Sequence, residues 1–190
     1  KQGDTFAVFN RHGDFQHIGI GDQGLYHCDT RFLSRFELTV NQKRPMLLNS
    51  TIKSDNSLMT VDQTTPDMLL AGQCEIRKGT VHIFRSKLLL EDVLYEHIRL
   101  QNFSGKEIDF TLEIEVAADY YDIFQVRGVS RQKEGCQLPV TFKDNKICLG
   151  YRGLDNVTRK THIVFNRIPE WGNKPAIRFP VSLQPHQKLE

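Results

Sequence analysis

Apolar and polar residues alternate along most of the chain, which is the pattern of half-buried β-strands. The clearest alternation runs through Leu94–Gln101 and Ile108–Val116, on either side of the turn Asn102–Lys106. These two segments are expected to pair as a long antiparallel hairpin with one apolar and one polar face. Together with the other β-rich segments, they indicate roughly a dozen short strands separated by turns. The pattern therefore predicts an all-β fold, a large antiparallel β-sandwich with little helix.

Further strands are expected along the whole chain. Their ranges are Thr5–Asn10, Phe15–Ile18, Arg31–Val40, Met46–Ile52, Leu58–Asp62, Val81–Leu90, Tyr151–Leu154, Thr158–Phe165 and Ala176–Leu183. The sequence shows no linker and no internal repeat, so residues 1–190 are expected to form one domain. Because the first residue is Lys1 and not Met, we expect an excised N-terminal piece of a longer protein.

Composition narrows the class of protein. The chain is 39% hydrophobic and 25% charged with a net charge of +2, which gives no strong field for nucleic acid. It has no run of about 18 apolar residues and no leader, so we expect a cytoplasmic protein without a membrane partner. The four cysteines lack zinc-site spacing and are expected to be free thiols. No metal and no cofactor is expected.

The run Gly19–Gly24 matches the dinucleotide fingerprint Gly-x-Gly-x-x-Gly. That motif needs a following helix, whose N-terminal amide groups hold the pyrophosphate. Here the next residues are typical of a strand. The sequence therefore gives no nucleotide site, and the glycines are expected to form a loop.

Polar side chains crowd the segment Gly24–Leu38, which begins GLYHCDTRFLS. Asp29 and Arg31 alternate, so on a strand they would share one face, where they could form a bidentate ion pair beside Tyr26 or His27. Such a pair either fixes a loop or contacts a ligand, and the sequence leaves both open.

A second polar segment, Ala117–Gly128, follows the strand that ends near Val116. Asp119 and Asp122 stand three residues apart, but sequence spacing in a loop cannot establish the separation that glycoside hydrolysis requires. Catalysis by these two residues is not expected. The adjacent aromatic residues suit a sugar-binding surface, although they could equally belong to the core.

Five motifs, in order along the chain, resemble the N-terminal domain of bacterial amylo-α-1,6-glucosidase (glycogen debranching) proteins. They are the opening GDTF, the family's GLYxxDTRFLS, its VLYERLRLxN strand, its ADxxDIFxVRG element, and YRGLD at Tyr151–Asp155. The family usually has Arg where this chain has Cys28, which puts any charged contact at that position in doubt.

The resemblance implies a β-sandwich of the supersandwich type, followed by an (α/α)₆ barrel in the same polypeptide that supplies the catalytic carboxylates. The fragment itself would not be catalytic. It would pack beside the barrel and lend loops to a cleft that binds an α-glucan or oligosaccharide. The candidates to face that cleft are Tyr26, Asp29, Arg31, Asp119, Tyr121, Asp122 and Arg127.

Two alternatives belong to other classes. One is a freestanding carbohydrate-binding module with Tyr120, Tyr121 or Trp171 as stacking platforms. The other is an enzyme of the aldose-mutarotase type, in which His82 or His97 would work with Glu96 or Glu113. The debranching-type interpretation predicts an exposed apolar patch where the partner domain docks.

Overall fold

A computed structural model describes residues 1–16, 21–70, 73–171 and 176–190 of the chain. The expected strand Phe15–Ile18 and the glycine run Gly19–Gly24 lie partly outside these ranges. Of their described residues, Phe15 forms a bridge to Phe36, and Gly24 pairs with Val8. In the described part of the chain, no helix is long and apolar enough to cross a membrane.

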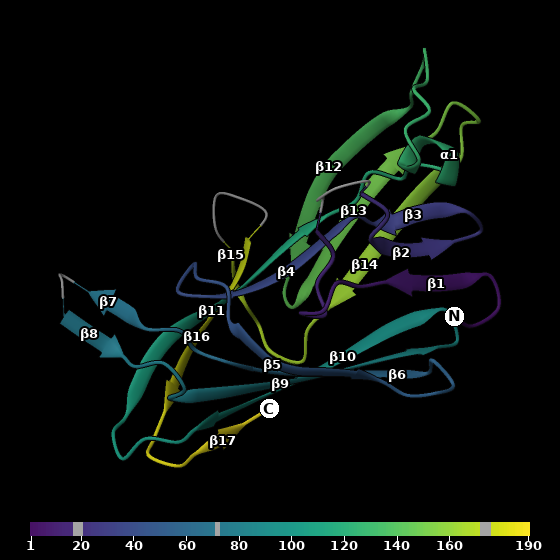
Figure 1. The fold of residues 1–190 in the computed structure, drawn as a ribbon. Coiled ribbons are helices and arrows are strands. Elements are labelled where there is room, and N and C mark those ends of the chain that lie inside the picture. The colour runs from purple at the N-terminus through teal and green to yellow at the C-terminus, as the bar shows by residue number, and fades with distance from the viewer. Residues whose placement is uncertain (17–20, 71–72, 172–175) are drawn as a thin grey trace.

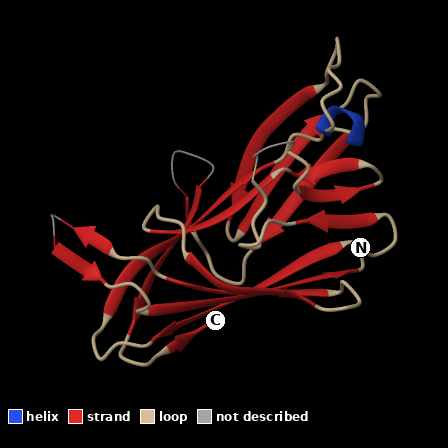
Figure 2. Ribbon diagram, in the orientation of Figure 1, coloured by secondary structure: helices blue, strands red, loops and turns tan. Residues whose placement is uncertain are grey.

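The described residues form an all-β structure of several antiparallel sheets with one short helix (Figures 1 and 2). Two larger sheets have the strand orders β17-β10-β9-β6-β5 and β15-β16-β11-β4, and three smaller sheets are β1-β2-β3, β12-β13-β14 and β7-β8. The strands of the two larger sheets are β4 Arg35–Val40, β5 Met46–Ile52, β6 Leu58–Thr64, β9 Val81–Leu90, β10 Val93–Asn102, β11 Ile108–Ala117, β15 Glu170–Trp171, β16 Ala176–Leu183 and β17 Lys188–Leu189. The remaining elements are β1 Thr5–Val8, β2 Gly24–His27, β3 Thr30–Leu33, β7 Met68–Leu70, β8 Gln73–Ile76, α1 Ile123–Val126, β12 Cys136–Lys143, β13 Lys146–Arg152 and β14 Thr158–Val164.

The two larger sheets form the sandwich that the alternation predicts. Their inward residues make one core cluster, with Val81, Ile83 and Leu100 from one sheet against Leu38 and Phe110 among those from the other. Each sheet buries one apolar face. Apolar residues therefore alternate along its strands, and those on the inward face form the core. The all-β sandwich is therefore confirmed.

The predicted hairpin between Leu94–Gln101 and Ile108–Val116 is wrong. Both segments are strands, β10 and β11, but β10 pairs with β9 while β11 pairs with β4 and β16. The turn after Asn102 therefore carries the chain from one sheet to the facing sheet. Alternation shows which face of each strand is apolar. It does not show whether two strands pair within one sheet or face each other across the core of a sandwich.

The hairpin in this region is formed by β9 and β10. Glu91 and Asp92 join them, and both residues have positive φ (49° and 60°), which is the geometry of a tight type I′ turn. This places the whole length of β10 beside β9. Among the described residues, β17 pairs with the other side of β10 only at Leu100 and Gln101.

A second core cluster lies at the other end of the molecule, where β1, β2 and β3 approach the sheet β12-β13-β14 (Figure 1). It contains Leu33 of β3, Val116 of β11, Leu149 of β13 and Ile177 of β16, together with Phe15. Because β11 and β16 contribute to both clusters, they join the sandwich to this second layer.

Candidate functional site

The segment Gly24–Val40 is three strands and not one. Cys28 and Asp29, with positive φ of 45° and 58°, form a tight turn between β2 and β3, and Ser34 separates β3 from β4. His27, Asp29 and Arg31 therefore do not share one strand face, and the expected pair between Asp29 and Arg31 is not formed. The polar residues of this segment therefore belong to a β-hairpin. Its turn, Cys28 and Asp29, is exposed, and its second strand buries Arg31 and Leu33.

Arg31 instead pairs with Asp119, 88 residues along the chain. Its Nε and Nη2 atoms donate to the two carboxylate oxygens over 3.1 and 2.5 Å, and Nη1 donates to the carbonyls of Gly21 and Gln23. The side chain is 2% exposed. Burial by itself would lower the pKa of Arg31, but the hydrogen bonds and charge of Asp119 raise it above its ordinary value. This bidentate ion pair between Arg31 and Asp119 joins the two polar segments.

The backbone completes the link. The Arg31 N–H donates to the Tyr121 carbonyl over 2.8 Å, and the Tyr120 N–H donates to the Arg31 carbonyl over 3.1 Å. Tyr120 takes a positive φ of 58° and is buried, and its hydroxyl lies 2.9 Å from the Leu149 carbonyl oxygen. The segments Gly24–Leu38 and Ala117–Gly128 therefore meet in space, a point that their sequences leave open.

The second polar segment continues into helix α1. Asp122 caps this helix by accepting hydrogen bonds from the N–H groups of Phe124 and Gln125, and it pairs with Arg131 over 2.5 Å. Partial burial would raise the pKa of Asp122, but the bonds from Gln125 and Arg131 lower it below its ordinary value. The Asp122 carboxylate is therefore held ionised by local structure, and the Ile123 N–H ties α1 to the carbonyl of Asp29.

The seven candidates for a cleft-facing role divide into three residues that bond to one another or to the backbone within the domain and four that lie wholly or partly at the surface. Tyr26 and Arg31 are buried, and their polar atoms bond within the domain: the Tyr26 hydroxyl donates to the Asp22 carbonyl over 2.6 Å. Asp119 is partly exposed and serves Arg31. The others lie wholly or partly at the surface: Asp29, Tyr121, Asp122 and Arg127. Tyr121 also lines a small hollow of about 250 Å³ that contains Arg131.

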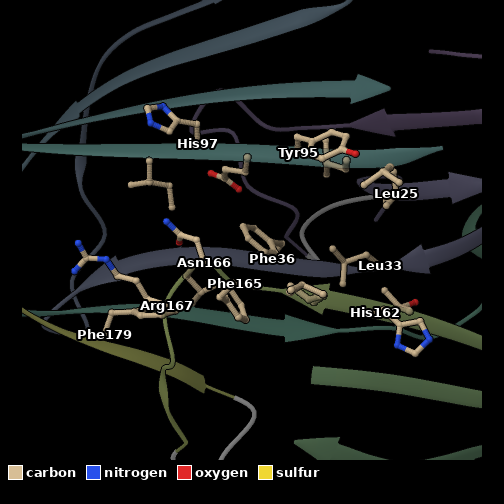
Figure 3. Close-up of a pocket in the computed structure, with 18 of the residues that line it drawn as sticks. Leu25, Leu33, Phe36, Tyr95, His97, His162, Phe165, Asn166, Arg167 and Phe179 are labelled. Carbon is tan, nitrogen blue, oxygen red and sulfur yellow. The ribbon is translucent and has the colours of Figure 1, made fainter. Parts of the chain in front are cut away.

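A larger concavity than this hollow lies elsewhere, between strand β10 and the chain around the end of β14 (Figure 3). Its volume is about 920 Å³, near the upper end of the range for ligand pockets. Leu33 and Phe36 come from β3 and β4, Phe165 follows β14, Phe179 lies on β16, and Tyr95 and His97 lie on β10 (Figure 3). We call this concavity the β10 cleft. Glu96 and His97, which the sequence offers for the mutarotase alternative, line this cleft. The sequence does not indicate the cleft itself, because its walls come from several segments that are far apart in the chain.

The mouth of the β10 cleft carries exposed apolar side chains. Val93 and Tyr95 on β10 are 47% and 53% exposed, and Val164 and Ile168 on the opposite side are 63% and 77% exposed. Exposed apolar residues that gather around one concavity are typical of an interaction surface, whereas single ones need no explanation.

A buried charge network supports the wall of the cleft. Arg85, fully buried, donates to Asp14 over 2.6 Å and to Glu96 over 2.7 Å. Lys87 Nζ lies 2.5 Å from the other oxygen of Glu96, an ionic contact without hydrogen-bond geometry, and it stands 5.2 Å from the ring centroid of Phe9.

Burial and the neighbouring charge of Arg85 lower the pKa of Lys87 to about 8, although Glu96 opposes that shift. Burial would raise the pKa of Glu96, but the two cations lower it. Because Lys87 is buried beside the like charge of Arg85, it is the group of this network that loses its proton most readily.

This arrangement does not favour acid–base chemistry of the mutarotase type. Glu96 is engaged by Arg85 and Lys87, and Glu113 by Arg178 over 3.1 Å. A general base needs a pKa near the working pH, and the pKa of Glu96 is moved the other way. His82 lies 3.0 Å from Asp62, a carboxylate outside the expected pairs.

One of the three stacking residues expected for a carbohydrate-binding module, Tyr120, is not accessible to a ligand. Tyr120 is buried, with its ring stacked on Tyr151 at 5.5 Å, so it cannot stack on a sugar. Trp171 packs against Phe142 at 4.7 Å and against the second core cluster. Cys28, Cys136 and Cys148 are free thiols, and the side chain of Cys74 lies outside the described residues.

Fold and site together define an all-β sandwich domain with an open, apolar cleft at one sheet edge. A family model described as the N-terminal domain of (some) glycogen debranching enzymes matches residues 1–190, the whole chain. The chain belongs to this family. A comparison with curated proteins gave no match.

Proposed function

We propose that this chain is the non-catalytic N-terminal domain of a cytoplasmic debranching-type α-1,6-glucosidase and that it packs against a catalytic (α/α)₆ barrel in the same polypeptide. The observation that carries the proposal is the β10 cleft with its exposed apolar mouth, in a chain whose family is found in debranching enzymes. The described residues offer no unengaged carboxylate pair at a concavity, which favours a supporting role.

The hairpin turn at Asp29 and the segment from Tyr121 to Arg127 are proposed as the loops that this domain lends to the glucan-binding cleft of the barrel. Support comes from their placement: both are at the surface and both are fixed to one buried anchor, the Arg31–Asp119 pair. A rigid anchor beneath exposed polar side chains suits a role in positioning substrate. In this proposal Tyr26, Arg31 and Asp119 act by holding these loops and not by touching the glucan.

The proposal is tested in the parent polypeptide by placing charge at the mouth of the cleft. The double variant Val164→Asp/Ile168→Asp is expected to lower both the melting temperature and the α-1,6-glucosidase activity of the parent, because a charge in an apolar interface is left unpaired. Leu48→Asp is the matched control, since Leu48 is 60% exposed on β5 and does not line the cleft. Equal behaviour of the two variants would contradict the proposal, as would hydrolysis of α-1,6 linkages by residues 1–190 alone.

A further inference from the structure

The strand β10 has an open edge. β9 pairs with it along its full length on one side, from Val93 to Asn102. On the other side β17 pairs only with Leu100 and Gln101. Among the described residues, no strand pairs with the outer side of Val93–Arg99. Exposed edges of this length present unpaired N–H and C=O groups, and proteins normally cover or disrupt them.

β17 already starts to cover this edge. Its register places Lys188 opposite Gln101 and Leu189 opposite Leu100, so the strand runs antiparallel to β10 and heads along the open edge towards Val93. Glu190 continues in that direction, and its carboxylate lies 3.4 Å from Nε2 of His97. Both Leu189 and Glu190 line the β10 cleft.

The side chains beside the edge suit an extended peptide. Leu94 and Ile98 point inwards and pack on the core clusters, while the floor of the cleft is made of Phe36, Phe165 and Phe179. A strand added here would direct alternate side chains into the cleft and complete the sheet with backbone hydrogen bonds.

We infer that the segment immediately following Glu190 in the parent polypeptide extends β17 along β10, so that it covers the open edge and fills the β10 cleft. This inference rests on the proposed function, which supplies a chain that continues into a catalytic domain. The added strand fixes how the following domain is attached to this one.

The register fixes which residues meet. Glu190 continues the pairing opposite Arg99, so the first residue after Glu190 faces Ile98, the third faces Glu96 and the fourth faces Tyr95. Opposed residues on an antiparallel pair share one face of the sheet. The first, third and fifth residues after Glu190 therefore point into the cleft and are expected to be apolar.

The test is disulfide trapping in the intact parent. The background variant has serine in place of the four cysteines of this domain, Cys28, Cys74, Cys136 and Cys148. Tyr95→Cys is combined with a cysteine at the fourth residue after Glu190, and the pair is expected to close under mild oxidation in most molecules. The matched control places the second cysteine at the fifth residue, whose side chain points to the opposite face. A failure to close at the fourth position, or equal closure at the fifth, would overturn the inference.

Hydrogen exchange on the unsubstituted parent gives a second measurement that does not depend on variants. Alternate amides of Val93–Arg99 that point away from β9 are expected to exchange at least about tenfold more slowly than those of Ser130–Glu134, which are exposed and lie outside any strand or helix. Rapid exchange of these amides overturns the inference. If they exchange rapidly while the Val164→Asp/Ile168→Asp variant still loses activity, the inference fails and the proposed function stands. If that variant also behaves like Leu48→Asp, the proposed function fails.

Discussion

Removal of the Asp119 carboxylate should destabilise the domain more than any other single change to its polar segments. Asp119→Ala leaves the Arg31 guanidinium buried with only the Gly21 and Gln23 carbonyls as acceptors. Removing one partner of a buried pair costs about 3–5 kcal/mol of unfolding free energy. The Asp119 side chain is 21% exposed, so water offsets part of this cost and we expect a value of about 3 kcal/mol.

The assay is urea denaturation followed by circular dichroism and by the fluorescence of Trp171, the single tryptophan. A loss of about 3 kcal/mol corresponds to a drop of roughly 6–12 °C in melting temperature for a chain of this size. Arg35→Gln is the control, because Arg35 pairs with Glu37 and Glu115 while its side chain is 45% exposed, and such pairs contribute about 1 kcal/mol or less.

A double-mutant cycle isolates the pair itself. Arg31→Met combined with Asp119→Ala should cost less than the sum of the two single changes, because the second removes a charge that the first left unpaired. The reasoning is refuted if Asp119→Ala costs no more than Arg35→Gln, or if the two changes are additive.

Three further predictions concern single positions. Gly24→Ala should lower the free energy of unfolding by about 2 kcal/mol or more in urea denaturation, since a Cβ there would lie 2.5 Å from Cδ of Arg31. Gly105→Ala is the control and should be close to neutral, because open space surrounds Gly105. Tyr120→Phe should cost about 1–2 kcal/mol by the same assay, because it leaves the Leu149 carbonyl without its buried donor, and an unchanged midpoint would contradict this. The pKa of Lys87 is about 8 in the folded state and 10.5 in the unfolded state, so between these pH values the folded state binds fewer protons. The free energy of unfolding should therefore rise by up to about 3 kcal/mol as the pH increases from 8 to 10.5. Lys87→Met should abolish that rise, and an equal rise in the variant would assign it to another group.

The sequence predicts the strands of this fold better than their partners. Val81–Leu90 is a strand with the predicted bounds, and its composition indicates it. Its buried face carries Arg85 and Lys87, so apolar–polar alternation does not mark this strand. The partners of β10 and β11 could not be predicted, since residues that face each other across a core carry the same pattern as residues in adjacent strands. Tight turns were also missed: Cys28–Asp29 lacks the Asn-Gly or Asp-Gly signal that usually marks such a turn.

The candidate site was predicted in part for the same reason. Two polar segments were recognised from Arg31 and Asp119, and they do meet, but the partner of Arg31 lies 88 residues away and no local spacing could identify it. The β10 cleft has no local signature at all, because its walls are formed by segments whose apolar residues look like ordinary core residues. The mouth of the cleft is recognised from the structure, in which Val164 and Ile168 are exposed beside it.

The central claim is that the β10 cleft is covered by the rest of the parent polypeptide, and side-chain footprinting of the intact parent tests it most directly. Val93, Tyr95, Val164 and Ile168 should be labelled much less than their exposure in this domain implies. Leu48, Leu69 and Leu154, which are 60%, 62% and 65% exposed and do not line the cleft, serve as internal controls. Protection of the first set with full labelling of the controls is the predicted result, and labelling of both sets to the same degree would contradict the account.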